Sequence, residues 1–194
     1  MPRLGYIFIC FVLYFAVLYV SLPTIEYAVL DYQYVSDQFA FSFKLVFLFL
    51  LILCVYSSID YYFLERVFFV EYYFLIIFFC VSSFLLISSN DFTLFYLAIE
   101  LQSLVLYTLA ALKRYNVFST ESGLKYFVLG AFSSGLLLFS ISLFYGFYGF
   151  LNFYEAKFVF LGWFVLSTHY AIALAIIFLL SALMFKLAAA PFHI

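Results

Sequence analysis

The stretch Ala171–Ile194, AIALAIIFLLSALMFKLAAAPFHI, is apolar enough to cross a bilayer, yet it holds Lys186 inside the run and Pro191 shortly after it. A lysine ammonium in hydrocarbon costs at least about 2.5–3.5 kcal/mol. Proline lacks a backbone N–H and its ring collides with the preceding turn, so the helix should break just after Lys186. Broken helices occur at membrane depth where they are buried in protein or line a watery cavity. The stretch therefore predicts a functional site at Lys186, and a structural lysine that extends to the headgroups is the alternative.

The composition of the whole chain indicates an integral membrane protein. Of its 194 residues, 70% are hydrophobic and 9% are charged, and the mean hydropathy is +1.22. The apolar runs are long blocks, which predicts helices and not barrel strands. Because most connections are short, we expect one all-α bundle of about six transmembrane helices over residues 1–194. The predicted spans are Leu4–Leu22, Phe39–Ile59, Val67–Ser88, Phe92–Leu112, Leu124–Phe150 and Phe158–Ala190.

The basic residues predict the orientation of this bundle. We name the membrane side on which the N-terminus lies side A and the opposite side B. Lys157 is the one basic residue in the predicted connections on side B. Side A holds the others in short connections: Arg3, Arg66, Lys113 and Arg114. Lys and Arg accumulate on the cytoplasmic side of membrane proteins. Side A is therefore predicted to be the cytoplasm or, for an organelle product, the matrix.

Glu100 is a second ionisable residue inside a predicted span. It lies too far from either end of Phe92–Leu112 for a short carboxylate side chain to reach the headgroups. Its helical face carries polar side chains at three- and four-residue spacing. These are Thr93, Tyr96, Glu100, Ser103 and Tyr107. The pattern is typical of an ion or proton path, and a protonated Glu100 that is hydrogen-bonded within the bundle is the alternative.

Two further lysines lie near the starts of predicted spans. Lys125 follows Glu121 by one helical turn, so a local ion pair is one interpretation and a partner on another helix is the second. Small residues follow at 130–135 and would allow a neighbouring helix to approach closely. Lys44 is shallow enough to extend to the headgroups and is interpreted as structural.

The remaining candidate ligands indicate no soluble-enzyme chemistry. Cys10, Cys54 and Cys80 stand alone in separate apolar runs, so we interpret them as small core residues. His169 is interpreted as a structural histidine, and His193 follows the predicted break. Two histidines on one helix do not support haem ligation, and no phosphate loop, catalytic triad, metal-ligand spacing or basic nucleic-acid patch occurs. We therefore predict no bound metal or cofactor and no nucleic-acid partner.

At these residues the sequence resembles subunit 2 of respiratory complex I, the NADH–ubiquinone oxidoreductase. That family is one of three families of antiporter-like membrane subunits, which are related to cation/proton antiporters. The resemblance covers roughly residues 71–194, and the Asp37–Lys44 region is similar more loosely. It is carried by EYYFLIIFFC (71–80), LAIELQSLVLYTLAAL (97–112), ESGLKYFVLGAFSSGLLLFSISLFYG (121–146) and FKLAAAPFHI (185–194).

The resemblance implies half of an inverted-repeat fold and a role in proton translocation. Glu100 matches the family's intramembrane glutamate, Lys125 its charge partner on the next helix, and Lys186 the lysine of the broken helix. In that family the glutamate tunes the proton affinity of its lysine partner. The broken-helix lysine passes protons along a central hydrated axis, and His193 would be a neighbour of this relay. Energy would come from NADH oxidation and ubiquinone reduction elsewhere in the complex.

The resemblance also implies a location and partners. The chain would hold no redox centre, and FMN, iron–sulfur clusters and ubiquinone would lie elsewhere in a complex of the mitochondrial inner membrane. Its neighbours would be other complex I membrane subunits and lipids, and its N-terminus would lie in the matrix. Family members continue past PFH with a second repeat, so we expect a separate polypeptide to supply the C-terminal half, with a truncated sequence as the alternative. Two other functions stay open: a subunit of a multi-subunit cation/proton antiporter, and a scaffold that no longer pumps.

Overall fold

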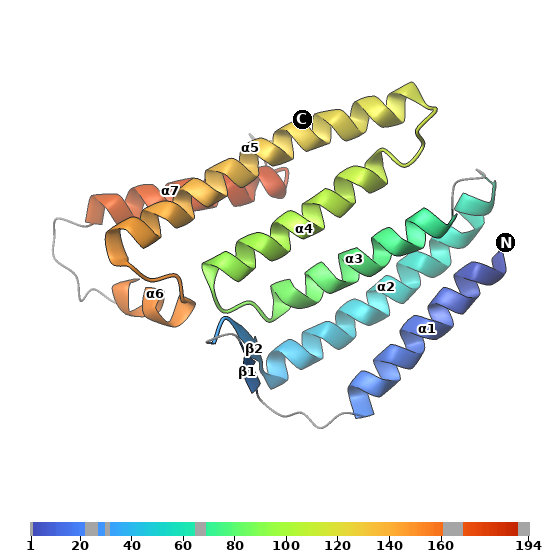
Figure 1. Ribbon diagram of the computed structural model, residues 1–194, viewed down its shortest axis with the longest axis horizontal. Coiled ribbons are helices and arrows are strands. Elements are labelled where there is room, and N and C mark those ends of the chain that lie inside the picture. The colour runs from blue at the N-terminus through green and yellow to red at the C-terminus, as the bar shows by residue number, and fades with distance from the viewer. Residues whose placement is uncertain (1, 22–26, 30–31, 65–68, 161–168, 190–194) are drawn as a thin grey trace.

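The fold is a bundle of antiparallel helices, seen in a computed structural model that describes residues 2–21, 27–29, 32–64, 69–160 and 169–189. The helices are α1 (Pro2–Ser21), α2 (Gln38–Leu64), α3 (Phe69–Ile87), α4 (Phe92–Ala110), α5 (Val117–Tyr148), α6 (Phe153–Phe160) and α7 (His169–Lys186). A hairpin of β1 (Tyr27–Val29) and β2 (Tyr34–Ser36) lies between α1 and α2. Figure 1 shows α1 to α5 side by side in chain order, with α7 against α5.

Four of the described helices are long and apolar enough to cross a membrane. These spans are Gln38–Ile59, Val70–Ile87, Phe92–Ala110 and Val117–Phe147. The runs Gly5–Tyr14 in α1 and Ile172–Lys186 in α7 are apolar but shorter. The multi-span helical fold expected from composition is thus confirmed, and single charged residues such as Glu100 lie within continuous helices.

The sixth span was predicted to begin at Phe158, and this start is wrong. Phe158 belongs to α6, which ends at Phe160, whereas α7 begins at His169. α6 occupies most of what was expected to be a connection, and the Asn152 side chain accepts a hydrogen bond from the backbone N–H of Tyr154 in its first turn. Hydropathy cannot detect this boundary, because both segments are apolar and neither proline nor a run of charges separates them. The predicted break at Pro191 lies outside the described residues.

At the side B end of the bundle, three connections are joined by backbone hydrogen bonds. The N–H of Val35 in β2 donates to the carbonyl of Ser88 at 2.9 Å, and the N–H of Asn90 donates to Gln33 at 2.8 Å. The N–H of Phe153, which opens α6, donates to the carbonyl of Asn90 at 3.1 Å. The hairpin was not expected from the sequence, since three-residue strands give too short an alternation to be recognised.

The buried hydrophobic cluster lies between α4, α5, α6 and α7. Ala175 and Ala182 are almost fully buried, which lets the backbone of α7 approach α5 closely. Across this contact the Ser140 hydroxyl donates to the carbonyl of Ala175 at 2.8 Å. The buried cluster consists of Phe92, Leu137, Ile141, Phe144, Ala156, Ala175 and Ala182. These helices form the rigid support for the residues discussed next.

Lys44 does not extend to the surface, contrary to expectation. Its side chain is 2% exposed, and Nζ donates a hydrogen bond to the hydroxyl of Tyr34 at 2.9 Å. The ammonium also faces the rings of Tyr34 and Phe84 at 5.1 and 5.8 Å. Because these contacts reach from α2 to β2 and α3, Lys44 holds the hairpin to the bundle, which agrees with a structural role.

The three cysteines are free thiols and, contrary to expectation, they do not lie in the core. Cys10 and Cys54 are exposed and Cys80 is half-buried. A membrane protein turns apolar side chains outward as well as inward, so an apolar run does not distinguish a core position from a lipid-facing one.

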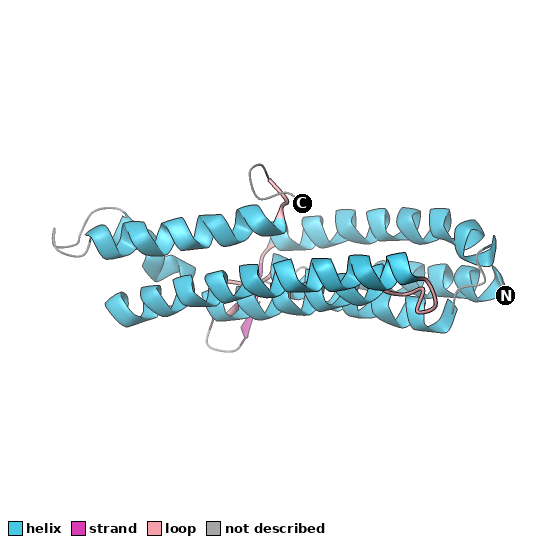
Figure 2. Cartoon of the chain, turned by 90° about the horizontal axis from the view of Figure 1, so that it is seen from above, coloured by secondary structure: helices cyan, strands magenta, loops and turns pink. Residues whose placement is uncertain are grey.

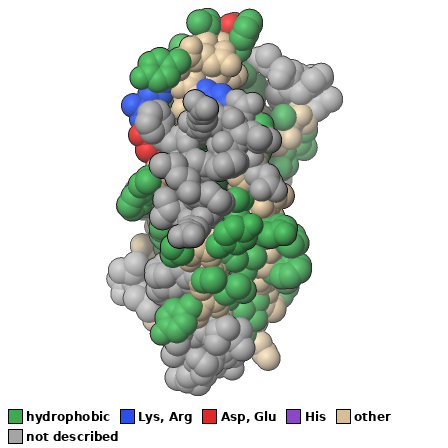
Figure 3. All heavy atoms as spheres, turned by 90° about the vertical axis from the view of Figure 1, so that its right-hand side faces the viewer, with side chains coloured by type: hydrophobic (Ala, Val, Ile, Leu, Met, Phe, Trp, Pro, Cys, Tyr) green, Lys and Arg blue, Asp and Glu red, His purple; other side chains and the backbone are tan. Residues whose placement is uncertain are grey.

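Basic side chains gather at the side A end, where α4 is followed by α5. Lys113 donates a hydrogen bond to the hydroxyl of Tyr61 at 3.1 Å, and Arg114 forms an ion pair with Glu71. Figure 3 looks onto this end and shows basic and acidic side chains there, with hydrophobic ones below them. Two of the charges that set the predicted orientation, Lys113 and Arg114, are therefore tied to the end of α2 and the start of α3.

Candidate functional site

Lys186 is the last residue of α7, so the helix ends at the lysine as the sequence predicted. The N–H of Ala188 donates to the carbonyl of Phe185 at 3.2 Å, and the N–H of Ala189 donates to Met184 at 3.1 Å. This pair of bonds is the Schellman motif that closes helices. It requires a left-handed residue, and Ala188 takes this role with φ of 50°. The carbonyl end of α7 favours a positive charge, which is what Lys186 supplies.

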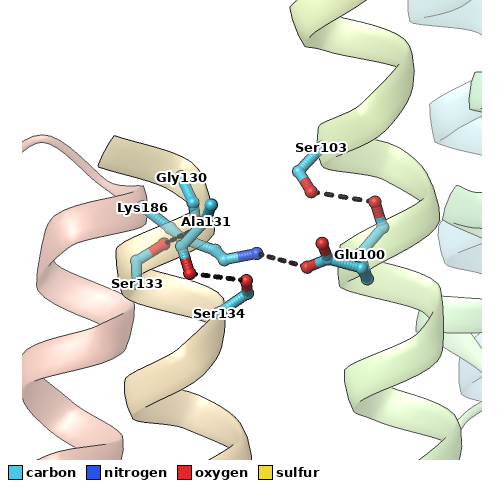
Figure 4. A network of polar contacts seen from close by, with 7 residues as sticks. All are labelled: Glu100, Ser103, Gly130, Ala131, Ser133, Ser134 and Lys186. Atoms are coloured by element: carbon cyan, nitrogen blue, oxygen red, sulfur yellow. Dashed lines mark hydrogen bonds and ion pairs between the residues drawn. The ribbon is translucent and has the colours of Figure 1, made fainter. Parts of the chain in front are cut away.

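α7 ends midway along the bundle, beside the middle of α5 (Figure 2). Lys186 thereby lies level with Glu100 on α4, although α5 stands between their two helices. Figure 4 shows the lysine side chain crossing from α7 to α4 past Gly130, Ser133 and Ser134 of α5. Both hydroxyls bond back to their own helix, from Ser133 to Gly130 at 2.8 Å and from Ser134 to Ala131 at 3.0 Å. The small-residue patch therefore provides the passage for the lysine.

The Nζ atom of Lys186 lies 3.8 Å from Oε2 of Glu100, and the two side chains are 17% and 28% exposed. Two unit charges about 4 Å apart attract by about 4 kcal/mol at an effective dielectric constant near 20. The distance is too long for a hydrogen bond, and within the described part of the chain neither atom has a hydrogen-bond partner. Each group thus keeps the capacity to bind a water molecule or to exchange a proton.

A cavity of about 510 Å³ adjoins this ion pair. It runs between α4 and α5, past the end of α7, towards the end of the bundle where α4 finishes. Its polar lining consists of Gln102, Ser103, Tyr107, Tyr126, Ser133 and Lys186. At about 30 Å³ per molecule, the volume has room for roughly 15 waters. Most of the wall is apolar, and these polar groups stand along it between the lysine ammonium and the side A end of α4.

Lys125 does not pair with Glu100. Its Nζ lies 2.7 Å from the carboxylate of Glu121, one turn earlier on the same helix, and both side chains are more than half exposed. Of the two interpretations left open by the sequence, the structure contains the local pair. Lys125 nevertheless precedes Tyr126, which lines the cavity, so it stands near the outer part of the same route.

The two histidines cannot be placed at the site. His193 lies outside the described residues, and for His169 only its position at the start of α7 is described. Among the described residues, no group of three or more His, Cys, Asp or Glu side chains could hold a metal ion.

Sequence reasoning missed three contributors to the site. Tyr107 was seen only as part of the polar face of α4, and Gly130 only as a small residue. The structure places the Tyr107 hydroxyl directly against Gly130, where an added Cβ would lie 1.6 Å from it. Ala188, with its left-handed backbone, carried no signal at all because alanine rarely adopts that conformation.

Fold and site together define an all-helical, multi-span membrane protein that carries an ionisable pair between its helices. Residues 89–194 match the family described as NADH:quinone oxidoreductase/Mrp antiporter, TM. The chain belongs to this family.

Relatives within the family are respiratory subunits. The chain is 44% identical over 136 residues to the NADH-quinone oxidoreductase subunit N of Pelagibacter ubique, an alignment that covers 70% of this chain and 28% of the relative. It is also 44% identical over 138 residues to the NADH-ubiquinone oxidoreductase chain 2 of Marchantia polymorpha, with the same coverage of both chains. The chain thus spans about a third or less of the length of these relatives.

A solved structure shares the fold. A chain of respiratory complex I from Thermus thermophilus with bound aureothin superimposes with a TM-score of 0.74 and 28% identity, over 99% of this chain and 40% of that one. The helix arrangement of this protein is therefore that of an antiporter-like subunit, as the sequence predicted.

Proposed function

We propose that this chain is a proton-translocating membrane subunit of respiratory complex I, and that protons pass through the Glu100–Lys186 pair. The observation that carries the proposal is the pair itself: two opposite charges 3.8 Å apart inside the bundle, neither hydrogen-bonded within the described chain, beside a cavity that several polar side chains line. The family and the respiratory relatives support the same function. NADH oxidation and ubiquinone reduction elsewhere in the complex would supply the energy.

The transfer follows from the electrostatics of the pair. While Glu100 is ionised, its negative charge stabilises the protonated ammonium of Lys186. A movement or protonation of Glu100 removes that stabilisation, and the ammonium then releases its proton to an acceptor in the cavity. When the carboxylate returns, the amine takes up the next proton. A conformational step that shifts one partner by a few ångströms is thus coupled to proton binding at the other.

We assign supporting roles to Lys125 and His193. Lys125, which precedes the cavity-lining Tyr126 in the chain, would exchange its ion pair with Glu121 for a proton-delivering contact with Glu100, as the resemblance implies. His193 would continue the route beyond the end of α7. Within the chain, no redox cofactor is involved in these steps; FMN and iron–sulfur clusters belong to other subunits of the complex.

The partners follow from the length of the relatives. The rest of their fold, whether it continues this chain or comes from a separate polypeptide, would pack beside α5 and the end of α7 and supply the second repeat. Other membrane subunits of complex I and lipids would cover the remaining apolar faces. The location is the mitochondrial inner membrane, with side A and the N-terminus in the matrix.

Purification through a tag on this chain tests the proposal. Mild detergent extraction should yield an assembly that oxidises NADH and reduces a ubiquinone analogue, with flavin and iron–sulfur subunits identified by mass spectrometry. An assembly without redox subunits, which exchanges sodium or potassium for protons in liposomes, would contradict the proposal and favour the antiporter alternative. A NADH-oxidising assembly whose pumping is unaffected by loss of the Glu100 charge would favour the scaffold alternative.

A further inference from the structure

The cavity beside Lys186 contains a tyrosine whose position is unusually constrained. The hydroxyl of Tyr107 occupies the space of a missing side chain on α5, since a Cβ on Gly130 would lie 1.6 Å from Oη and 2.3 Å from Cζ. Real Cβ atoms essentially never approach other atoms so closely. Glycine at position 130 is therefore what allows the phenol to bridge α4 and α5.

Aromatic neighbours fix the ring of Tyr107. It is 7% exposed, and the rings of Tyr126 and Phe127 stand edge-on to it at 4.8 and 5.7 Å between centroids. Such perpendicular arrangements are the favoured geometry for aromatic pairs. The phenol is thus held by its ring, and its hydroxyl is carried at a defined point of the cavity wall.

That point lies between the ion pair and the end of α4. Tyr107 is on the same face of α4 as Glu100 and, at 1.5 Å per residue, about 10 Å further along the helix axis. Tyr107, Tyr126 and Lys186 all line the cavity of about 510 Å³. A proton that travels through the cavity from side A to Lys186 thus has the phenol along its route.

The serine hydroxyls of the route are committed to the backbone. Ser103 donates to the carbonyl of Glu100 at 2.8 Å, and Ser133 donates to Gly130 at 2.8 Å. The Ser103 side chain also interacts with the phenol of Tyr107. A phenol can accept a proton and donate its own. Of the two phenols on this wall, Tyr126 is 42% exposed whereas Tyr107 is buried between the helices, so Tyr107 is the one held next to the inner part of the route.

We propose that Tyr107 is a relay residue for the Glu100–Lys186 pair and that Gly130 is its positioning residue. The proposal rests on the function proposed above. The phenol oxygen accepts a proton from cavity water on the side A flank as its own proton passes to water next to Glu100 and Lys186. Rotation of the hydroxyl then restores the starting arrangement, so the phenol is neutral before and after each transfer.

Three variants of the intact complex, reconstituted in liposomes, test the proposal. Tyr107→Phe removes the hydroxyl and keeps the ring, whereas Gly130→Ala keeps the hydroxyl but displaces it. Tyr145→Phe is the matched control, because Tyr145 is also a tyrosine of this bundle, on α5, but it is 58% exposed and does not line the cavity. The proton-pumping rate at equal electron flow is measured in H₂O and in D₂O, with Lys186→Ala as the reference for full loss.

We expect Tyr107→Phe and Gly130→Ala to reproduce most of the loss of Lys186→Ala and to increase the solvent isotope effect on pumping, because transfer through the gap becomes the slow step. Tyr145→Phe should pump as the native complex does. Suppose that Tyr107→Phe pumps with the native rate and isotope effect while Lys186→Ala is impaired. This result would overturn the relay role of Tyr107 and leave the proposed function intact. Native pumping in Lys186→Ala would instead overturn the proposed function. Should Tyr107→Phe fail to assemble, Gly130→Ala decides, since alanine favours the helix and alters only the place of the phenol.

Discussion

Lys186 Nζ, at the end of α7, and Glu100 Oε2, in the middle of α4, lie 3.8 Å apart although another helix separates their backbones. The contact exists because α7 stops midway along the bundle and because α5 has only small side chains where the lysine crosses it. Two independent features of the sequence, a helix end and a small-residue patch, thus meet at one ion pair.

Neutralising one partner should destabilise the protein. Glu100→Gln leaves the ammonium of Lys186 without its counter-charge, and the loss for a fully buried pair is about 3–5 kcal/mol. Since the two side chains keep 17% and 28% exposure, we expect a smaller loss of about 1–3 kcal/mol. The thermal midpoint of the purified complex would report it. Glu121→Gln, at the exposed pair with Lys125, is the control and should leave that midpoint unchanged.

Neutralising both partners should separate stability from function. The double variant Glu100→Gln, Lys186→Met removes the charges together, so no uncompensated charge stays buried and much of the lost stability should return. Proton pumping should remain as low as in either single variant. If pumping recovered along with stability, the pair would be a structural element and not a proton carrier.

The end of α7 carries backbone strain that glycine would relieve. Ala188 has φ of 50°, a left-handed conformation that costs roughly 1–2 kcal/mol for a residue with a Cβ. We expect Ala188→Gly to stabilise the complex by about 1 kcal/mol, measured as a higher thermal midpoint. Ala189→Gly is the control; its φ is not positive, so it should not stabilise. Equal effects of the two variants on the thermal midpoint would contradict the claim that the backbone of Ala188 is strained.

Lys44 should be replaceable by an apolar side chain of similar length. Lys44→Met keeps the packing between α2, β2 and α3 and removes a buried charge, so the change in stability should be within about 1 kcal/mol. Lys44→Ala leaves a cavity at a position that is 2% exposed and should cost about 2–4 kcal/mol. Proteolysis of the connection before α2 should accelerate in the alanine variant alone. Loss of pumping in Lys44→Met, with assembly intact, would show that the charge itself is needed.

The membrane fold and the two charged residues of the site could be predicted because a charged residue within a long apolar run is rare and costly in lipid. Glu100 and Lys186 stand in apolar runs where an unpaired charge is costly, and Pro191 indicated that the helix ends near the lysine. The chemistry of single residues was thus sufficient to locate both ends of the ion pair.

The pairing itself could not be predicted. Lys125 and Lys186 were both available to Glu100, and the choice depends on where α7 ends relative to α4, which no local pattern encodes. The burial of Lys44 could not be predicted for the same reason, because it depends on the position of the β1–β2 hairpin relative to α2. The boundary between α6 and α7 was missed because hydropathy does not change there.

The number of protons translocated per electron by the reconstituted complex that carries Lys186→Ala tests the central claim most directly. Lys157→Ala is its control, since Lys157 is exposed on the short helix α6 and far from the ion pair in the chain. The account predicts a ratio below the native value for Lys186→Ala and a native ratio for Lys157→Ala, with NADH oxidation by the flavin site unchanged in both. A native ratio for Lys186→Ala would contradict proton transfer through this site.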